Sequence, residues 1–356
     1  MIKSYFLTIT QYENLGDLVI NKMLIEEISR YSEVYLDRGS YSNAFIDELK
    51  SVDCKDVYTT YGLSLHTPSC IYKTLRFIKR EGIKCFFVSP GPKSIGSLFS
   101  IRILVLLFIY FWCRLNGIKA YYVGVDLRTT TKSNRIYNSL LSICLEKIYL
   151  RDNIILKEFK KPNIEYIPDL SLLYNNKVKS FLKEKLILMS FRKFEGIEHN
   201  QKFEHYLDSV VKYYIDKNYR IKFFYQVERD KKYNEYLYSK YIDNKNISMC
   251  DSLIWYKDMD LLYSSSSVVV SNRMHVLLFG LIYKSNIIAM LGNQPSTKKI
   301  TYVFKSIGID HTIYDINEKS FNGLNLELSD NDLKKIVREQ CCIIEDTIRR
   351  IFKNNN

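Results

Sequence analysis

The sequence predicts an α/β protein with two domains, each a parallel sheet covered by helices. Its 356 residues exceed what one small hydrophobic core needs. Short β-type runs alternate with helical patterns along almost the whole chain, which is typical of parallel sheets with helices on both faces. A polar stretch, 175–185, separates the two halves. We therefore expect an N-terminal domain over 1–175, a C-terminal domain over 185–325 and a final helix over 329–353.

The expected elements follow from the spacing of apolar residues. Alternating or continuous apolar runs predict strands, and apolar residues three or four positions apart predict helices. In the first half the expected strands are Tyr5–Thr10, Glu33–Asp37, Lys84–Ser89, Lys119–Val125, Lys147–Leu150 and Ile164–Pro168, with helices over Leu18–Tyr31, Ile71–Lys79 and Asn134–Leu145. In the second half the expected strands are Lys185–Phe191, Arg220–Val227, Val268–Ser271, Asn286–Met290 and His311–Tyr314, with helices over Phe203–Lys217, Lys231–Tyr241, His275–Tyr283 and Asn331–Phe352.

The composition bounds the classes of partner. Lys and Arg number 52 against 39 Asp and Glu, so the formal net charge is +13. This excess favours anionic partners such as phosphorylated small molecules or acidic lipid surfaces. The basic residues are dispersed and no nucleic-acid-binding motif occurs, so we expect no nucleic acid partner. The 8 cysteines include no CxxC pair, and we expect reduced thiols, no essential metal and no cofactor.

An apolar run of eleven residues, Ile103–Cys113, lies between Arg102 and Arg114. It is too short to span a bilayer. A buried core helix is the favoured interpretation. The alternative is a helix lying against the inner face of a membrane, with the flanking arginines among lipid phosphates. We see no signal peptide and expect a cytoplasmic protein, with peripheral contact to the inner membrane left open.

Two loops of the first half carry polar residues at the ends of strands. The loop Gln11–Asp17 contains Glu13, Gly16 and Asp17, and the helix that follows presents free N–H groups suited to an anion or a sugar hydroxyl. A plain capped helix explains this loop equally well. The loop Ser89–Gly96 contains Lys93 and Ser94, and its Gly and Pro residues favour a structural turn over a ligand site.

The loop after the strand Val268–Ser271 carries the most informative residues. Arg273 and His275 stand between a strand of valines and a helix of apolar residues. Arginine offers a fork of donors suited to carboxylate or phosphate, and histidine exchanges a proton near neutral pH. Arg192 follows another strand of the same half, and Lys298 and Lys299 follow a third. The second half therefore brings positive charge to one edge of its sheet.

At this point the sequence resembles the polysaccharide pyruvyl transferases. The matching elements are Asn14-Leu15-Gly16-Asp17, Tyr149-Leu150-Arg151-Asp152, Pro168-Asp169, Ser190-Phe191-Arg192 and Ser271-Asn272-Arg273-Met274-His275 with the apolar residues up to Gly280. They follow the order and spacing of that family over roughly residues 10 to 305. The chain departs from the family where Ser89–Lys93 replaces a glycine cluster and where Lys284–Asn286 replaces a Gly-x-Pro.

The resemblance implies two facing Rossmann-like domains of the GT-B type. It implies phosphoenolpyruvate as donor, bound by the C-terminal domain, and a sugar of a surface polysaccharide or its precursor as acceptor, bound by the N-terminal domain. Arg273 and His275 inherit catalytic roles at the donor, and Arg192 matches a further donor-contacting arginine. We assign Ser271, Asn272 and Lys298 to the donor side and Glu13, Asn14, Gly16 and Asp17 to the acceptor side.

The chemistry of ketal formation explains why an arginine and a histidine stand together. The methylene carbon of phosphoenolpyruvate must gain a proton, which we assign to His275, while cations hold the carboxylate and the departing phosphate. The main rival is a GT-B-like glycosyltransferase that uses a nucleotide sugar, because fold alone does not decide function. A binding protein without catalysis is a third hypothesis. The acceptor is a lipid-linked oligosaccharide or a finished polymer, and the sequence does not decide between them.

Overall fold

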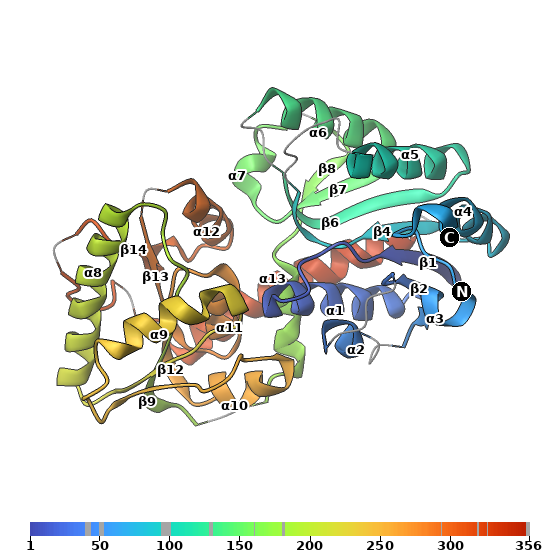
Figure 1. The fold of residues 1–356 in the computed structure, drawn as a ribbon. Coiled ribbons are helices and arrows are strands. Elements are labelled where there is room, and N and C mark those ends of the chain that lie inside the picture. Colours follow the sequence, from blue (N-terminus) through green and yellow to red (C-terminus); the bar gives the residue numbers. More distant parts are fainter. Residues whose placement is uncertain are drawn as a thin grey trace. The chain divides into compact units, whose positions relative to one another are not determined.

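The structure is a computed structural model that describes residues 1–39, 44–49, 53–93, 101–127, 131–159, 161–179, 182–292, 294–318, 320–325 and 327–353. The chain forms two compact units. The first contains 1–12, 17–170 and 342–356, and the second contains 13–16 and 171–341. Each unit is described by itself below. Figure 1 shows the ribbon with its element labels.

The first unit is built on an eight-stranded sheet whose described strand pairs are all parallel. Seven strands run in the order β3-β2-β1-β4-β6-β7-β8, and β5 pairs with β6 off this path. The strands are β1 (Ile2–Leu7), β2 (Ser32–Asp37), β3 (Lys55–Asp56), β4 (Cys85–Val88), β5 (Gly91–Lys93), β6 (Lys119–Leu127), β7 (Lys147–Leu150) and β8 (Ile164–Tyr166). The helices are α1 (Leu15–Ser29), α2 (Ala44–Leu49), α3 (Val57–Tyr61), α4 (Ile71–Arg80), α5 (Ile101–Leu115), α6 (Lys132–Cys144) and α7 (Asn153–Leu156), with a 3-10 turn at Pro68–Cys70.

Helices cover both faces of this sheet. Buried side chains of α4, α5 and α6 form one apolar core with alternate residues of the strands, among them Phe86 and Tyr122. The neighbouring Phe87 points to the opposite face, because successive side chains of a strand alternate, and it packs on Phe352 of the last helix. Tyr31, just after α1, stacks on the same Phe352. The α4–α5–α6 layer therefore lies opposite the layer that contains this last helix.

The second unit repeats the plan with a six-stranded parallel sheet in the order β11-β10-β9-β12-β13-β14. The strands are β9 (Glu184–Ser190), β10 (Arg220–Phe223), β11 (Ile247–Met249), β12 (Ser266–Ser271), β13 (Asn286–Leu291) and β14 (Ile313–Asp315). The helices are α8 (Ile197–Asp216), α9 (Lys231–Ser239), α10 (Met259–Tyr263), α11 (Met274–Ile282), α12 (Pro295–Ser306) and α13 (Asp330–Lys353), and the 3-10 turns are η2 (Leu170–Lys177), η3 (Glu228–Asp230), η4 (Tyr256–Asp258) and η5 (Asp310–Thr312).

Both sheets have the strand order of a doubly wound fold, so each has a point where the order reverses. In the first unit that point lies between β1 and β4, and in the second between β9 and β12. Ligands of open parallel sheets bind outside the carboxyl ends of the strands at this point. The loops after β9 and β12 are therefore where the fold of the second unit favours a binding site.

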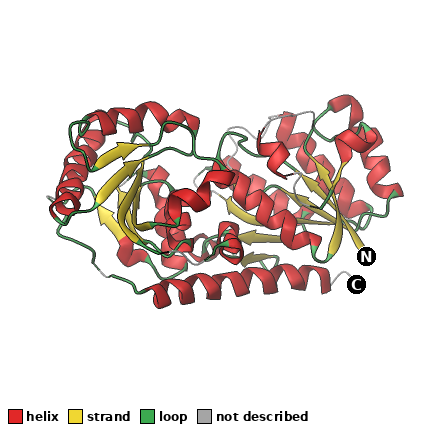
Figure 2. Cartoon of the chain, turned by 90° about the horizontal axis from the view of Figure 1, so that it is seen from below, coloured by secondary structure: helices red, strands yellow, loops and turns green. Residues whose placement is uncertain are grey.

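The predicted fold class is confirmed: both units are α/β with parallel sheets, and a C-terminal helix ends the chain (Figure 2). Some predicted strands are longer than the observed ones, since β10 ends at Phe223 and not at Val227. The loop expected over 89–96 forms the short strand β5, and residues 94–96 lie outside the described residues. The helix α13 is shared, because its residues up to Cys341 belong to the second unit and the rest to the first.

The prediction that Ile103–Cys113 forms a buried core helix is right for one side of α5 only. Ile109, Tyr110 and Cys113 are buried, whereas Phe108 and Phe111 are at least half exposed. The run is apolar around the whole helix, and the sheet covers just one of its faces.

Candidate functional site

The loops after β9 and β12 bring Arg192 and Arg273 to the reversal point of the second sheet. The two strands are neighbours in register, with Ser190 opposite Ser271. Arg192 follows β9 after one intervening residue, and Arg273 follows β12 after one intervening residue. The prediction that both arginines lie at the carboxyl edge of one sheet therefore agrees with the strand order.

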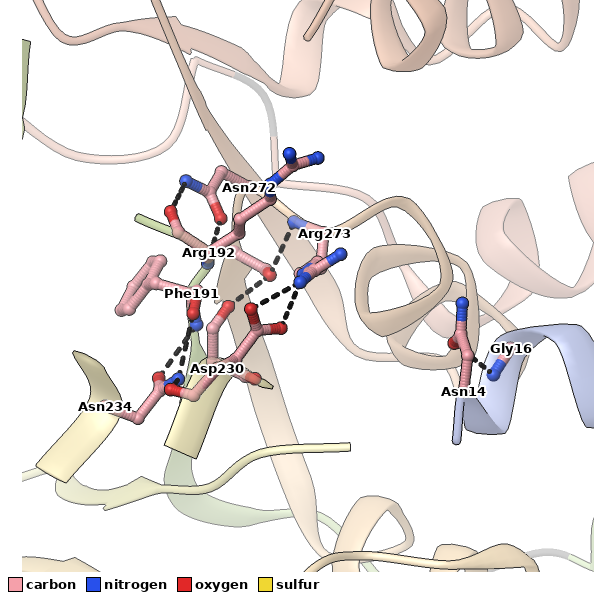
Figure 3. A network of polar contacts seen from close by, with 10 residues as sticks. Asn14, Gly16, Phe191, Arg192, Asp230, Asn234, Asn272 and Arg273 are labelled. Carbon is pink, nitrogen blue, oxygen red and sulfur yellow. Dashed lines mark hydrogen bonds and ion pairs between the residues drawn. The ribbon is translucent and has the colours of Figure 1, made fainter. Parts of the chain in front are cut away.

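Side-chain amides hold the start of the β9 loop. The amide of Asn272 accepts a hydrogen bond from the Arg192 N–H and donates one to the Arg192 carbonyl, each 2.8 Å (Figure 3). The amide of Asn234, on α9, makes the same two bonds to Phe191, again at 2.8 Å. Beyond the end of β9, the backbone N–H and C=O groups no longer pair with a neighbouring strand. Each side-chain amide takes the place of that missing partner. The backbone beside the Arg192 side chain is thus fixed from two neighbouring elements.

Two further side-chain amides bind the backbone of this loop in the same way. Asn200 on α8 accepts from the Phe194 N–H at 3.0 Å and donates to the Phe194 carbonyl at 2.9 Å. Gln294, just before α12, accepts from the Glu195 N–H at 3.4 Å and donates to the Glu195 carbonyl at 2.6 Å. Four amides from four segments therefore bind the backbone of residues 191–195. Such a loop holds its shape before any ligand arrives.

Arg273 forms an ion pair with Asp230, at the end of the 3-10 turn η3. Burial lowers the pKa of the Arg273 guanidinium, and the charge of Asp230 opposes that shift. Burial raises the pKa of the Asp230 carboxyl, and Arg273, Arg229 and Arg192 oppose this rise by favouring the carboxylate. Three arginines thus act electrostatically on one carboxylate, so this edge of the sheet carries a surplus of positive charge.

Ser271 orders the turn from β12 into α11. Its side chain is fully buried, and its hydroxyl donates to the Ser190 carbonyl and accepts from the Arg273 N–H at 2.9 Å. Arg273 is the N-cap residue of α11, with extended backbone angles. In α11 all residues but His275 are buried. The helix therefore presents one polar, partly exposed side chain beside the arginine, and the His275 ring stacks on Phe279 at 6.2 Å.

A short N-terminal segment, residues 13–16, belongs to the second unit and lies against His275. A Cβ added at Gly16 would stand 1.9 Å from Nδ1 of His275, so only glycine fits beside this imidazole. Asn14 forms an isolated antiparallel bridge with Val227, and the Leu15 N–H donates to the Gln226 carbonyl at 3.4 Å. The Asn14 side chain accepts from the Gly16 N–H at 3.0 Å (Figure 3).

Other predicted site residues have separate surroundings. Asp17, one residue after Gly16, belongs to the first unit, where it accepts from the Gln11 N–H at 3.4 Å. Glu13 is exposed, and Lys298 is exposed near the start of α12. Lys93 lies in β5, in the first unit, and Ser94 is outside the described residues. The structure thus brings Gly16 to His275, whereas Asp17 is grouped with the other sheet.

The Arg-Asp motif after β7 lies in the first unit within a cluster of carboxylates. Arg151 is 2% exposed and pairs with Asp126 and Asp169, each at 3.4 Å. These carboxylates and Asp17 raise the pKa of Arg151 against the opposing effect of burial. Asp152 caps α7 through a 2.7 Å bond from the Ile155 N–H, and burial raises its pKa. This arginine is held by Asp126 of β6 and by Asp169 of the loop after β8.

Sequence reasoning missed Asp230, Asn234, Asn200 and Gln294. Their partners lie between 6 and 99 positions away in the sequence, so no local pattern points to most of these bonds. The one local signal is that Asp230 and Asn234 follow a strand and lie four residues apart at a helix start. Among the described residues no group of three or more His, Cys, Asp or Glu is placed to hold a metal ion. No helix in the described parts of the chain is long and apolar enough to cross a membrane.

Comparison with known proteins identifies the family. A family model described as polysaccharide pyruvyl transferase matches residues 14–290. The chain therefore belongs to the polysaccharide pyruvyl transferase family, and it is a transferase whose role is in polysaccharide synthesis. The match begins at Asn14 and includes Arg192, Arg273 and His275. A search of curated proteins finds no match.

Solved structures with the same fold have very different sequences. UDP-GlcNAc 2-epimerase from Neisseria meningitidis is 11% identical, with a TM-score of 0.57 over 99% of each chain. A putative UDP-N-acetylglucosamine 2-epimerase from Listeria monocytogenes is 10% identical, with a TM-score of 0.55 over 97% of this chain and 91% of that chain. A glycosyltransferase from Rickettsia africae is 12% identical, with a TM-score of 0.53 over 99% of this chain and 94% of that chain. These similarities show the fold alone, which is of the GT-B type.

Proposed function

We propose that the protein transfers the pyruvyl group of phosphoenolpyruvate to two hydroxyls of one sugar, forming a cyclic ketal. The sugar belongs to a cell-surface polysaccharide or to its lipid-linked precursor. The observation that supports this best is that Arg192, Arg273 and His275 all follow the two strands at the reversal point of the second sheet. Phosphoenolpyruvate carries a carboxylate and a phosphate, and arginine binds both groups with two parallel hydrogen bonds.

The two arginines hold the anionic groups of the donor in this proposal. Arg273 is oriented by Asp230, and Arg192 extends from the braced segment 191–195. A fixed pair of cations stabilises charge that moves onto phosphate during the reaction without reorganising at that moment. Ser271 and Asn272 then act as positioning residues, since their polar groups bind the Ser190, Arg192 and Arg273 backbone. Lys298, which is exposed near the start of α12, adds positive charge on the donor side.

His275 supplies the proton that starts the reaction. The imidazolium donates its proton to the methylene carbon of the donor, which becomes a methyl group, and the central carbon becomes electrophilic. One sugar hydroxyl adds to that carbon and loses its proton. The bond from the central carbon to the phosphate oxygen then breaks, and the second hydroxyl adds to close the ketal. General acid catalysis of this kind contributes roughly 10²–10⁴-fold.

The acceptor side is assigned to the first unit and to the segment 13–16. Asn14 and Gly16 shape the backbone next to His275, so a sugar bound there would lie near the proton donor. Asp17 or Glu13 accepts the proton of an attacking hydroxyl. The place of the reaction is the cytoplasm at the inner face of the membrane, where lipid-linked sugars are available. The proposed reaction uses no metal or other cofactor.

One rival has a specific observation in its favour. The fold is shared with a glycosyltransferase and with a UDP-GlcNAc 2-epimerase. A nucleotide-sugar donor would place its diphosphate at the same arginines. The family match favours pyruvyl transfer, because the matched residues 14–290 include both arginines and His275.

Turnover of phosphoenolpyruvate tests the proposal. Purified protein is mixed with phosphoenolpyruvate and lipid-linked saccharides extracted from membranes of the producing cells, and phosphate release and the acceptor mass are followed. We expect phosphate release that needs the extract, and an acceptor heavier by pyruvate minus water. A mass gain of a hexose or an N-acetylhexosamine with a nucleotide sugar, and none with phosphoenolpyruvate, would establish the rival.

A further inference from the structure

One side of α5 exposes a stripe of large apolar side chains. Leu104, Phe108, Phe111 and Leu115 are each between 50% and 70% exposed. They recur at steps of four, three and four residues, so they share one face of the helix. The opposite face of α5 is buried in the core of the first unit through Ile109, Tyr110 and Cys113. The exposed stripe therefore lies on the side of α5 that faces away from the core, while the other side packs on the sheet.

The neighbouring helix α6 carries a second stripe of the same kind. Ile136, Leu140 and Ile143 are between 38% and 57% exposed and also recur at steps of four and three. The two helices are in contact, and the guanidinium of Arg114 in α5 donates a hydrogen bond to the Ile143 carbonyl in α6. Figure 1 shows α5 and α6 next to each other. Seven exposed apolar side chains on two adjoining helices form what we term the α5–α6 surface. Contiguous exposed apolar patches mark contact sites.

The helices of this layer carry basic residues and no acidic ones. The helices α4, α5 and α6 cover the same face of the sheet, and none of the three contains Asp or Glu. They contain eight basic residues, four in α4 and two in each of the others. The α4 cations Lys73, Arg76, Lys79 and Arg80 line an open hollow. On the opposite face α13 mixes acidic with basic residues, so the absence of acid belongs to one layer.

We propose that the α5–α6 surface docks on an anionic lipid bilayer, with its apolar stripes among the acyl chains and the cations of α4 and α6 at the headgroups. Two adjoining apolar stripes in a layer of helices that contain basic residues and no Asp or Glu are the pattern of a helix surface that lies in a membrane interface. A second copy of the chain is a poorer occupant. In a symmetric dimer the same basic rim would face itself, and like charges in an interface cost affinity.

This docking deepens the proposed function, because it brings the protein to lipid-linked sugars. Its test needs no donor and no acceptor, so the two proposals fail separately. The full-length protein is floated on a density gradient with vesicles of phosphatidylcholine, or of equal parts phosphatidylcholine and phosphatidylglycerol. We expect binding to the mixed vesicles that weakens as salt is added and is much weaker on phosphatidylcholine alone.

Matched variants assign the binding to this surface. The double substitution Leu104→Asp with Phe108→Asp should lower the bound fraction roughly tenfold or more. Arg76→Glu with Lys79→Glu should lower it by about fivefold for each cation removed. The control is Leu261→Asp, which places one new carboxylate, against two in the double variant, at an 85% exposed leucine of α10 in the second unit. The control should float like the unsubstituted protein, and all variants should keep its melting temperature.

Three results would overturn the inference. The first is the absence of binding to mixed vesicles at low salt. The second is equal binding by the unsubstituted protein and the α5 double variant. The third is a stable dimer in light scattering that Leu104→Asp with Phe108→Asp dissociates while vesicle binding is absent, since the surface would then be occupied by a second copy of the chain.

Discussion

Two arginines stand at comparable places in the two sheets and have opposite electrostatic surroundings. Arg151 follows β7 in the first unit, is 2% exposed and lies among Asp126, Asp169 and Asp17. Arg273 follows β12 in the second unit and pairs with a single carboxylate, Asp230. Two more arginines act on that carboxylate from nearby. A cation surrounded by acids is neutralised within the fold, whereas a surplus of cations has charge left for an anionic ligand.

From this difference we infer that the family motifs of this chain divide into motifs that stabilise the fold and motifs that serve the proposed donor site. The Arg-Asp motif at 151–152 holds strand ends and caps α7. The Arg-x-His motif at 273–275 places a mostly buried arginine and a partly exposed histidine at the point where the sheet order reverses.

Replacing His275 should remove most of the activity and little of the stability. His275→Gln keeps a polar side chain of similar size but cannot deliver a proton as imidazolium does. We expect turnover to fall roughly 10²–10⁴-fold, measured as phosphate release from phosphoenolpyruvate. The melting temperature should change little, because His275 is the partly exposed residue of α11. Turnover close to that of the unsubstituted protein would show that another group provides the proton.

Replacing Arg151 should have the opposite effect, a large loss of stability and a smaller loss of activity. Arg151→Met leaves buried carboxylates without their cation, and the free energy of unfolding should fall by about 3–5 kcal/mol. Urea unfolding measures this change. The second variant, Arg151→Met with Asp169→Asn, removes one of the stranded charges and should recover part of the loss. An Arg151→Met protein with unchanged stability and no donor binding would reverse the division between the two arginines.

Adding one methyl group at Gly16 tests the contact with His275. The new Cβ of Gly16→Ala would meet Nδ1 at 1.9 Å, so the imidazole must move. Displacement of a reacting group by about 1 Å can lower the rate about 10²-fold. The control is Gly117→Ala, which strains a backbone with a φ of 68° but meets no atom within 4 Å. The control should lose some stability and keep its turnover. Equal turnover in both variants would mean that the position of His275 is unimportant.

The smallest expected effect concerns a lysine at the amino ends of the strands of the second sheet, on the side away from the arginines. Lys183 precedes β9 and donates to the Ser264 carbonyl at 3.1 Å, and burial lowers its pKa to about 8. Because the folded-state pKa lies below the unfolded one, Lys183 destabilises the folded protein at neutral pH, and this penalty disappears between about pH 8 and pH 10.5. Lys183→Met should be more stable by roughly 1–2 kcal/mol at neutral pH, given the partial exposure of this lysine.

The difference between the unfolding curves of the two proteins isolates this group from the tyrosines, which also titrate at high pH. The stability difference between Lys183→Met and the unsubstituted protein should shrink as the pH rises. Turnover should not change, because this edge of the sheet is the one away from the arginines. A difference that stays constant with pH would exclude a buried charge as its cause.

The fold, and the placement of Arg192 and Arg273 at one edge of the second sheet, follow from the sequence for physical reasons. Alternation of strand and helix patterns sets the parallel sheets, and the polar joint at 271–275 between two apolar elements is visible without a structure. Arg192 was also predicted, because it follows a strand of the same half. These features depend on neighbouring residues, which is why periodicity and motif order suffice to find them.

The remaining site features depend on contacts between distant segments. Asn272 binds Arg192, which is 80 positions away in the sequence, and Gln294 binds Glu195, which is 99 positions away. The spacing of apolar residues therefore predicts neither hydrogen bond. The grouping of Gly16 with His275 and of Asp17 with the first sheet divides a motif of adjacent residues. The exposed side of α5 was missed for a related reason. Because this run is apolar at every position, the sequence does not indicate which side of the helix packs on the sheet.

Donor binding at Arg273 separates a pyruvyl transferase from a nucleotide-sugar enzyme. The melting temperatures of the unsubstituted protein, Arg273→Met and Arg192→Met are followed with phosphoenolpyruvate and with UDP-GlcNAc. Phosphoenolpyruvate at a hundred times its dissociation constant should stabilise the unsubstituted protein by about 2.7 kcal/mol, and both variants should lose this stabilisation. Stabilisation by UDP-GlcNAc alone, or stabilisation by phosphoenolpyruvate that survives in Arg273→Met, would contradict the account.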